Sequence, residues 1–168
     1  MKKTTEKSIR YIARAGVIAA LYVALTAVSA AFGMASGTIQ VRISEALCIL
    51  PVITSAAVPG VTVGCIISNL IFGGTVYDII FGSLATLIGA ALAMLFKKLP
   101  YLASIPTILS NAIIIPAVLI VSGIGIWPEY PWIAFTVGLG ELISCGILGG
   151  LLLAAIKHNR KLSEILSK

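Results

Sequence analysis

The sequence predicts an all-α integral membrane protein with six transmembrane helices, some of them short or interrupted by proline and glycine. Hydrophobic residues make up 59% of the 168 residues and charged residues 11%, whereas charged residues make up about a quarter of a soluble domain. The mean hydropathy is +1.09. Apart from Arg42, the basic residues behind the net charge of +6 lie at the two ends and at Lys97–Lys98, outside the apolar stretches. They therefore indicate membrane topology rather than a nucleic-acid surface.

We expect residues 1–168 to form one transmembrane domain, with basic cytoplasmic segments at residues 1–11 and 157–168. The first apolar stretch, residues 15–32, has the length of a membrane span rather than that of a signal-peptide core, so we expect it to remain as a helix. Four of the basic residues that precede it lie at steps of four, three and four and so share one helix face: Lys3, Lys7, Arg10 and Arg14. We interpret this face as an anchor on anionic lipid, with contact to an acidic partner as the alternative.

Small residues recur at four-residue spacing in this first span. Ala15 and Ala19 form one ridge, and Gly16, Ala20 and Ala24 form the ridge beside it. Because neither ridge carries a large side chain, another helix can approach closely there.

The apolar sequence from Ala46 to Phe72 is interrupted by Pro51 and by Pro59–Gly60. Two halves of about 13 or 14 residues would each be roughly 20 Å long, which is short for a hydrocarbon core of about 30 Å. With the N-terminus inside, a single crossing would leave Lys97–Lys98 and the basic C-terminal tail outside, whereas a double crossing places every basic cluster in the cytoplasm. We therefore predict two short membrane segments that meet at Pro59–Gly60.

This topology places both termini in the cytoplasm and predicts spans near residues 12–33, 45–58, 60–73, 78–96, 101–122 and 132–156. A small, polar loop at residues 33–38 separates the first two. Breaks at Pro51, Pro59 and Pro116 are typical of a transport protein, because interrupted backbone persists at membrane depth only where protein or a wet cavity covers it.

The ionisable residues between the two ends, apart from Lys97–Lys98, fall in the outer half of this topology. They are Arg42, Glu45, Asp78, Glu129 and Glu141. Their one-sided distribution predicts a pocket that is open to the outside and rich in acids. We expect Arg42 to pair with Glu45 at i,i+3 or with an acid on another helix.

Simpler roles remain open for some of these acids. Glu45 follows Ser44, a suitable N-cap, and an acid in a first helical turn interacts favourably with the helix dipole. Asp78 is likewise suited to cap or start a helix, and Glu129 lies in a proline-rich connection where we interpret it as solvated. Glu141 lies roughly 15 Å into the last helix, where an unpartnered carboxylate costs on the order of 3 kcal/mol. We therefore expect Glu141 to face the interior and to define the pocket.

Neutral side chains extend the predicted site. Asn69 offers amide donors and acceptors to a base-like ligand, whereas Asn111 is interpreted as a bond between helices. Tyr77, Trp127 and Trp132 offer stacking surface, and interfacial anchoring explains the tryptophans equally well.

Several catalytic classes are excluded by missing motifs. The chain has no GxxxxGK[ST] motif, its single histidine, His158, lies in the basic tail, and Cys48, Cys65 and Cys145 stand alone in apolar stretches. We therefore expect no enzyme, no metal site and no cofactor in this chain.

Three stretches resemble the QueT family, the queuosine-precursor S components of energy-coupling factor (ECF) transporters. They are Ile39-Gln40-Val41-Arg42-Ile43-Ser44-Glu45-Ala46-Leu47, Tyr77-Asp78-Ile79-Ile80-Phe81-Gly82-Ser83-Leu84-Ala85-Thr86-Leu87 and Val137-Gly138-Leu139-Gly140-Glu141-Leu142. The resemblance covers about residues 11 to 157.

The resemblance implies a six-helix subunit of the cell membrane that captures a deazaguanine-type base from outside. It further implies docking on a transmembrane coupling subunit driven by two ATPase subunits, which use the ATP. The docking face would be of the AxxxA type, here Ala15–Ala19 and Ala20–Ala24. A deazaguanine carries adjacent N–H donors and, in its aminomethyl form, a cation. We assign Glu141 and Asn69 to the base edge and Glu45 or Asp78 to the amine.

Two other hypotheses remain. The chain could be a stand-alone exporter of small cations that uses Glu141 as a proton-coupled acid, or a scaffold subunit whose charges are structural only.

Overall fold

The helices of the structure follow the predicted spans closely. The computed structural model describes residues 2–34, 40–159 and 166, with side chains from residue 5 onward, and these residues form helices and no strands. The loop predicted at residues 33–38 lies largely outside the described residues. The elements are α1 (Lys2–Ala31), η1 (Ile43–Val52), α2 (Ala57–Ile71), η2 (Asp78–Gly82), α3 (Ser83–Ala93), η3 (Met94–Phe96), η4 (Pro100–Ala103), α4 (Ser104–Val121), η5 (Trp127–Glu129), α5 (Tyr130–Glu141), η6 (Leu142–Leu148) and α6 (Gly149–His158).

Four helical stretches are long and apolar enough to cross a membrane. They are Thr5–Ala31, Asp78–Phe96, Pro100–Val121 and Trp127–His158, and two shorter apolar helices cover Ile43–Val52 and Ala57–Ile71. Large hydrophobic side chains such as Leu95, Leu109 and Leu151 are exposed around the bundle. A surface of this kind is stable in lipid rather than in water, so the chain is a membrane protein.

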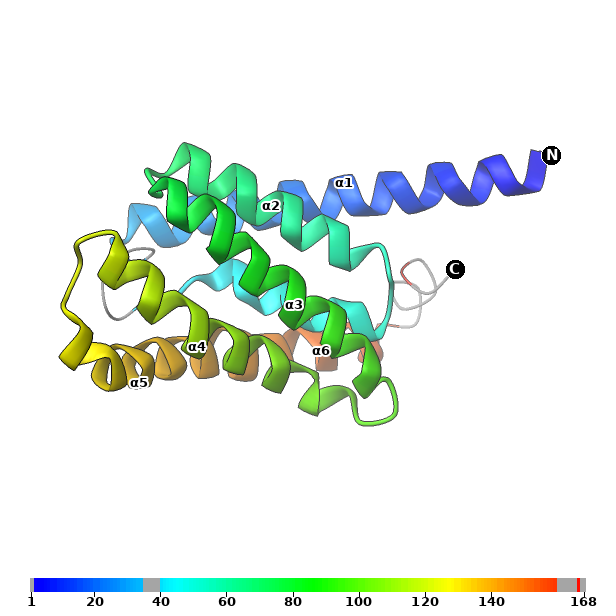
Figure 1. The fold of residues 1–168 in the computed structure, drawn as a ribbon. Coiled ribbons are helices and arrows are strands. Elements are labelled where there is room, and N and C mark those ends of the chain that lie inside the picture. Colours follow the sequence, from blue (N-terminus) through cyan, green and yellow to red (C-terminus); the bar gives the residue numbers. More distant parts are fainter. Residues whose placement is uncertain (1, 35–39, 160–165, 167–168) are drawn as a thin grey trace.

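The connections separate into two groups at opposite ends of the bundle. Figure 1 shows both labelled chain ends and the α3–α4 connection at one end, with the α2–α3 and α4–α5 connections at the other. Lys157 Nζ lies 4.9 Å from the ring centroid of Tyr101, so the end of α6 and the start of η4 are neighbours. The basic clusters that the structure describes therefore share one end of the bundle.

The break between the two short helices lies earlier in the chain than the predicted position at Pro59–Gly60. The helices η1 and α2 are separated at residues 53–56, while Pro59 and Gly60 lie in the first turn of α2. Proline is tolerated there because the first N–H groups of a helix have no intrahelical acceptor. Helix η1 is a 3₁₀-helix of ten residues, and at about 2.0 Å per residue it is longer than an α-helix of the same sequence would be.

The tightest helix contact joins α1 to α2. A Cβ atom added at Gly60 would lie 2.9 Å from Ala15 O, and one added at Gly64 would lie 2.6 Å from Tyr22 Cβ. The Ala15–Ala19 ridge therefore packs inside the protein, with Ala19 buried, whereas Ala20 and Ala24 are exposed.

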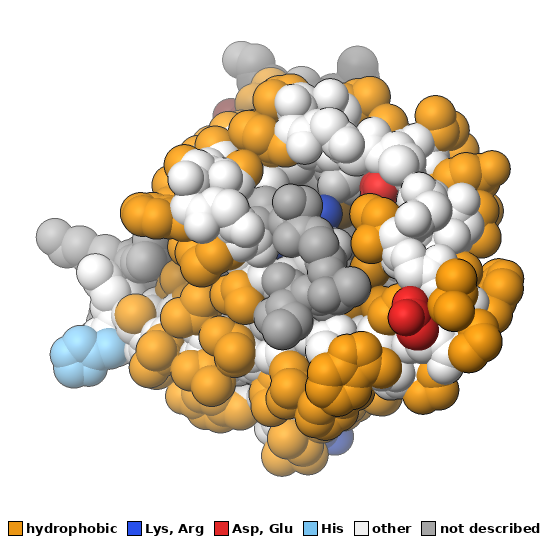
Figure 2. Space-filling model, turned by 90° about the vertical axis from the view of Figure 1, so that its left-hand side faces the viewer, with side chains coloured by type: hydrophobic (Ala, Val, Ile, Leu, Met, Phe, Trp, Pro, Cys, Tyr) orange, Lys and Arg blue, Asp and Glu red, His pale blue; other side chains and the backbone are white. Residues whose placement is uncertain are grey.

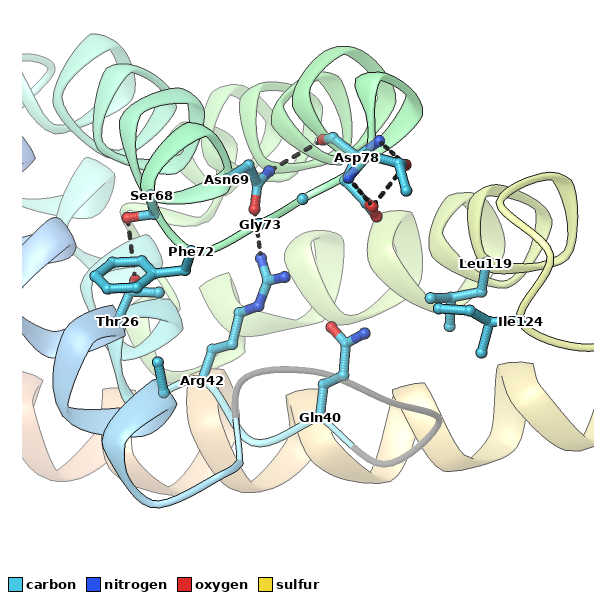
Figure 3. Close-up of a pocket in the computed structure, with 13 residues that line it drawn as sticks. Thr26, Gln40, Arg42, Ser68, Asn69, Phe72, Gly73, Asp78, Leu119 and Ile124 are labelled. Carbon is cyan, nitrogen blue, oxygen red and sulfur yellow. Dashed lines mark hydrogen bonds between the residues drawn. The ribbon is translucent and has the colours of Figure 1, made fainter.

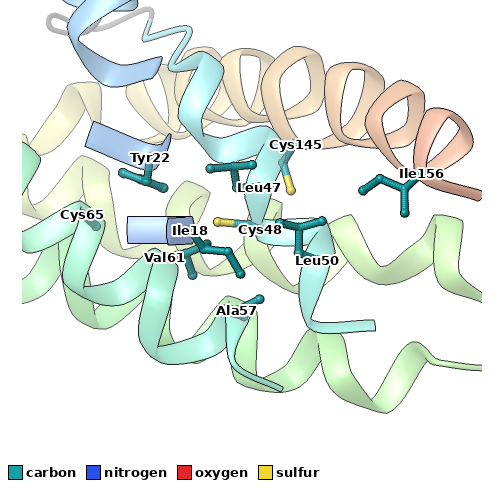
Figure 4. Packing of buried hydrophobic residues seen from close by; sticks show 11 residues of the cluster. Ile18, Tyr22, Leu47, Cys48, Leu50, Ala57, Val61, Cys65, Cys145 and Ile156 are labelled. Carbon is teal, nitrogen blue, oxygen red and sulfur yellow. The ribbon is translucent and has the colours of Figure 1, made fainter. Parts of the chain in front are cut away.

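The core beside this contact combines apolar side chains with three free cysteines. All three cysteines are buried, as expected for small hydrophobic residues. Figure 4 shows the main cluster between α1, η1, α2 and the last helix. Its members are Ile18, Tyr22, Leu47, Cys48, Leu50, Ala57, Val61, Cys65, Ala90, Cys145 and Ile156.

Two glycines test the α1–α2 contact. We expect Gly64→Ala to destabilise the protein by about 1–3 kcal/mol, because the added methyl group overlaps Tyr22. Gly16→Ala is the matched control, since a Cβ atom at Gly16 meets nothing within 4 Å. The thermal unfolding midpoint in detergent measures both. Equal midpoints for the two variants would contradict the close approach at Gly64.

Candidate functional site

A polar cavity of about 270 Å³ opens at the end of the bundle opposite to the basic clusters. Figure 2 looks onto this end and shows a few charged side chains among hydrophobic and other side chains. Residues of α1, α2, η2, α4 and three connections line the cavity. They are Thr26, Ala30, Gln40, Arg42, Ser68, Asn69, Phe72, Gly73, Gly74, Thr75, Asp78, Leu119 and Ile124.

Three of the predicted site residues meet in this cavity. Arg42 Nη1 donates a hydrogen bond to Asn69 Oδ1 at 3.2 Å. Asn69 Nδ2 donates to the backbone carbonyl of Asp78 at 3.0 Å. Figure 3 shows Arg42 and Asn69 pointing toward each other beneath the start of the Asp78 helix. The Asn69 amide thus links the guanidinium of Arg42, in the segment before η1, to the backbone of Asp78, nine residues after Asn69 in the chain.

Asp78 caps the N-terminus of its helix, which is the simpler role that the sequence suggested for this acid. Its Oδ2 accepts hydrogen bonds from Thr75 N at 2.8 Å and Thr75 Oγ1 at 2.7 Å. Asp78 N in turn donates to Thr75 Oγ1 at 3.2 Å. This reciprocal pair is a capping box, in which the side chains of the N-cap and N3 residues satisfy each other's backbone N–H. The cap fixes the carboxylate at the cavity wall.

Glu45 lies in the core instead of lining this cavity. It is 2% exposed, its Oε1 accepts a hydrogen bond from Tyr22 Oη, and its Oε2 lies 3.1 Å from Cys48 Sγ. The predicted N-cap is also wrong, because Arg42 holds that position and Ser44 Oγ lies 2.8 Å from Thr26 Oγ1. Glu45 does lie in the first turn of η1, the position at which an acid interacts favourably with the helix dipole.

Glu141 has a hydrogen-bond partner in the protein interior, as expected for a carboxylate far from the ends of a membrane helix. Asn111 Nδ2 donates to Glu141 Oε1 at 2.8 Å, so Asn111 bonds between helices as predicted. The charges of Glu45 and Arg42 both act on Glu141. Arg42, which lines the polar cavity, is thus also close enough to Glu141 for the two charges to interact.

Tyr77 and Trp127 lie away from the cavity. Tyr77 is 46% exposed and lines an apolar groove on the flank of the bundle with Phe81 and Val121. Because successive helix residues are rotated by about 100°, Tyr77 faces outward when Asp78 faces the cavity. Trp127 is 62% exposed and stacks on Tyr130 with ring centroids 6.5 Å apart. The aromatic ring at the cavity is Phe72.

Sequence reasoning missed the hydroxyl residues of this cavity. Ser68 Oγ donates to Thr26 Oγ1 at 3.2 Å, which joins α2 to α1 beside the cavity. Thr75 was detectable, because Thr75-x-x-Asp78 has the spacing of a capping box. No local pattern marks Thr26 or Ser68, since each is one hydroxyl in a long apolar helix.

Comparison with known proteins decides the family. The model of the QueT transporter family matches residues 12–158. The chain belongs to the QueT transporter family. This membership confirms the resemblance in the sequence. QueT proteins are transporters rather than enzymes, as predicted.

One curated QueT relative is the queuosine precursor transporter QueT of Lactococcus lactis subsp. cremoris (strain MG1363). It is 38% identical over 95 residues, which are 56% of this chain and 54% of the relative. The alignment thus spans about half the length of each protein. No solved structure matches the chain significantly.

The buried bond between Tyr22 and Glu45 has a direct test. We expect Tyr22→Phe to destabilise the protein by about 1–3 kcal/mol, because it leaves a buried carboxylate oxygen without its donor. Tyr130→Phe is the control, since Tyr130 Oη donates to Ile113 O at an exposed site. Thermal unfolding in detergent compares the two. A loss for Tyr22→Phe no larger than that for Tyr130→Phe would contradict the assignment.

Proposed function

We propose that this protein is the substrate-binding subunit of an ECF transporter. It captures a queuosine precursor or a related deazaguanine from outside the cell and passes it to a coupling subunit and two ATPase subunits. Family membership and the name of the relative support this function. The observation that carries it is the polar cavity, with Arg42 and Asp78 in its wall, at one end of an apolar bundle.

The charge distribution supports an outward-facing cavity. Lys97, Lys98 and Lys157 lie at the end of the bundle that also holds the chain termini, opposite the cavity. Basic residues concentrate on the cytoplasmic side of membrane proteins. Both termini are therefore cytoplasmic, the protein resides in the cell membrane, and the cavity opens to the exterior.

The cavity wall suits a flat, cationic base. The Asp78 carboxylate offers an acceptor for an aminomethyl cation, and Phe72 offers a ring face for stacking. Between the two acids considered for the amine, Asp78 is the better assignment, because both oxygens of Glu45 are engaged by Tyr22 and Cys48. Asn69 and Arg42 supply further polar contacts at the same wall.

Calorimetry with two related bases tests this function. We expect the purified protein to bind 7-aminomethyl-7-deazaguanine, and Asp78→Asn to weaken that binding about tenfold, since a hydrogen bond to a charged group contributes about 1.5–3 kcal/mol. Affinity for 7-deazaguanine, which lacks the aminomethyl group, should stay unchanged. The asparagine oxygen keeps an acceptor for the helix cap.

Glu129→Gln is the matched control, because Glu129 is an exposed acid outside the cavity lining. It should bind both bases like the wild type. Failure of the wild-type protein to bind either base would exclude the proposed function. An equal loss of both bases in Asp78→Asn would remove Asp78 from the amine contact.

The coupling subunit is proposed to dock on the outer ridge of α1. Gly16, Ala20 and Ala24 are exposed, whereas Ala15 and Ala19 pack against α2. The exposed ridge is bare enough for a partner helix to approach closely. Within the AxxxA face implied by family resemblance, the Ala20–Ala24 half is thus the one free to make contact.

Ala20→Trp tests this docking ridge. In proteoliposomes with the coupling and ATPase subunits, we expect it to abolish ATP-driven uptake while substrate affinity stays unchanged. Leu109→Trp, at an exposed position on α4, should transport normally. Persistent uptake by Ala20→Trp would place the docking surface elsewhere.

A further inference from the structure

Buried polar atoms without a hydrogen-bond partner gather on one side of the bundle. Among the described residues, these atoms belong to α3, α4, α5 and η6, and none belongs to α1, η1 or α2. They are Ser83 Oγ, Thr107 Oγ1, Asn111 Oδ1, Glu141 Oε2 and Ser144 Oγ. A buried polar atom is costly to leave unpaired, and another molecule that supplies the missing bonds would account for such a concentration.

Two of these atoms belong to a single hydrogen-bonded pair. Asn111, 3% exposed, donates its Nδ2 to Glu141 Oε1. An ionised carboxylate only accepts hydrogen bonds, so the NH₂ group of the amide must face it, and Oδ1 must face away. The pair thus holds two acceptors, Asn111 Oδ1 and Glu141 Oε2, in a fixed relation, and both lack a donor.

The pair adjoins the wall of the polar cavity. Gln40 and Arg42 line that cavity. The backbone oxygen of Gln40 is packed so closely against Gly140 that a Cβ atom there would overlap it. Glu141 is the next residue, and the charge of Arg42 acts on it. The pair therefore lies just beyond the Gln40–Arg42 segment.

The backbone is unusual at both places. The π-helix η6 begins directly after Glu141, and the π-helix η2 begins at Asp78 in the cavity wall. The π-helix is rare and occurs frequently at functional sites, because the extra residue in the turn shifts the side chains that follow. The acid of the cavity and the acid of the pair thus share this local feature.

We propose that Asn111 and Glu141 form a base-recognition subsite that adjoins the cavity. Asn111 Oδ1 and Glu141 Oε2 accept the two neighbouring N–H donors of a guanine-type edge, the ring N–H and the exocyclic amine. This inference rests on the proposed function and assigns Asn111, rather than Asn69, as the amide that determines specificity. A base without the exocyclic amine leaves one buried acceptor unpaired and is rejected.

Paired ligands test the subsite. Calorimetry compares 7-deazaguanine with 7-deazahypoxanthine, which lacks the exocyclic amine. We expect the wild-type protein to prefer 7-deazaguanine by about thirtyfold or more, since a site built to bond a donor discriminates strongly against its absence. In Glu141→Gln and in Asn111→Leu, the preference should fall to about threefold or less, because each change removes one acceptor.

Ser144→Ala is the control, because it alters a buried hydroxyl of the same region without touching the pair. It should keep the wild-type preference. A wild-type protein that binds both bases within about threefold overturns the inference whether or not the variants fold, and it would indicate that water satisfies the pair. Retained preference in both pair variants also overturns it, while the proposed function stands. Failure of the wild type to bind either base is a different outcome, which excludes the proposed function itself.

Discussion

The close approach of α1 to α2 is the contact on which the rest of the structure depends. Gly60 and Gly64 let the backbone of α1 lie against α2, and this places Tyr22 over Glu45 and Thr26 beside Ser68. A bilayer offers no water to a buried polar group, so each such group must find its partner inside the protein. The α1 side of the bundle meets this requirement through hydroxyl groups and one tyrosine. An acid can consequently remain in the apolar core next to three cysteines.

The opposite side of the bundle does not meet the same requirement. The Asn111–Glu141 pair uses one oxygen of the carboxylate and one donor of the amide, and leaves an acceptor on each residue. Arg42 interacts with both sides: it bonds to Asn69 at the cavity, and its charge acts on Glu141. The proposed substrate-binding role requires a bundle that is stable without ligand and a site that the ligand completes. Among the described residues, the contrast between a side whose buried polar atoms are bonded and a side with unpaired ones fits both requirements.

Most of the fold could be predicted because hydropathy and charge are properties of the chain alone. The helical stretches followed from apolar length, while the double crossing of residues 45–73 stays a prediction from the placement of Lys97–Lys98. The predicted position of the break, at Pro59–Gly60, was wrong. The sequence does not show whether a proline follows the end of one helix or lies in the first turn of the next. Of the predicted site residues, Arg42, Asn69 and Asp78 meet at one cavity, because each lies next to a helix terminus at the same end of the bundle.

The remaining assignments depended on which way a side chain points, and that is decided by packing. Tyr77 faces outward because its neighbour Asp78 caps the helix, and Ala19 faces α2 because Gly64 leaves room for it. The sequence by itself determined that this is a membrane protein with interrupted helices, because these features are set by composition and order. Only the tertiary structure decided that Glu45 is held by Tyr22 while Glu141 keeps a free oxygen beside Asn111. The physical reason is that hydrogen-bond partners in the bilayer come from other helices, and no spacing along the chain specifies which helix that is.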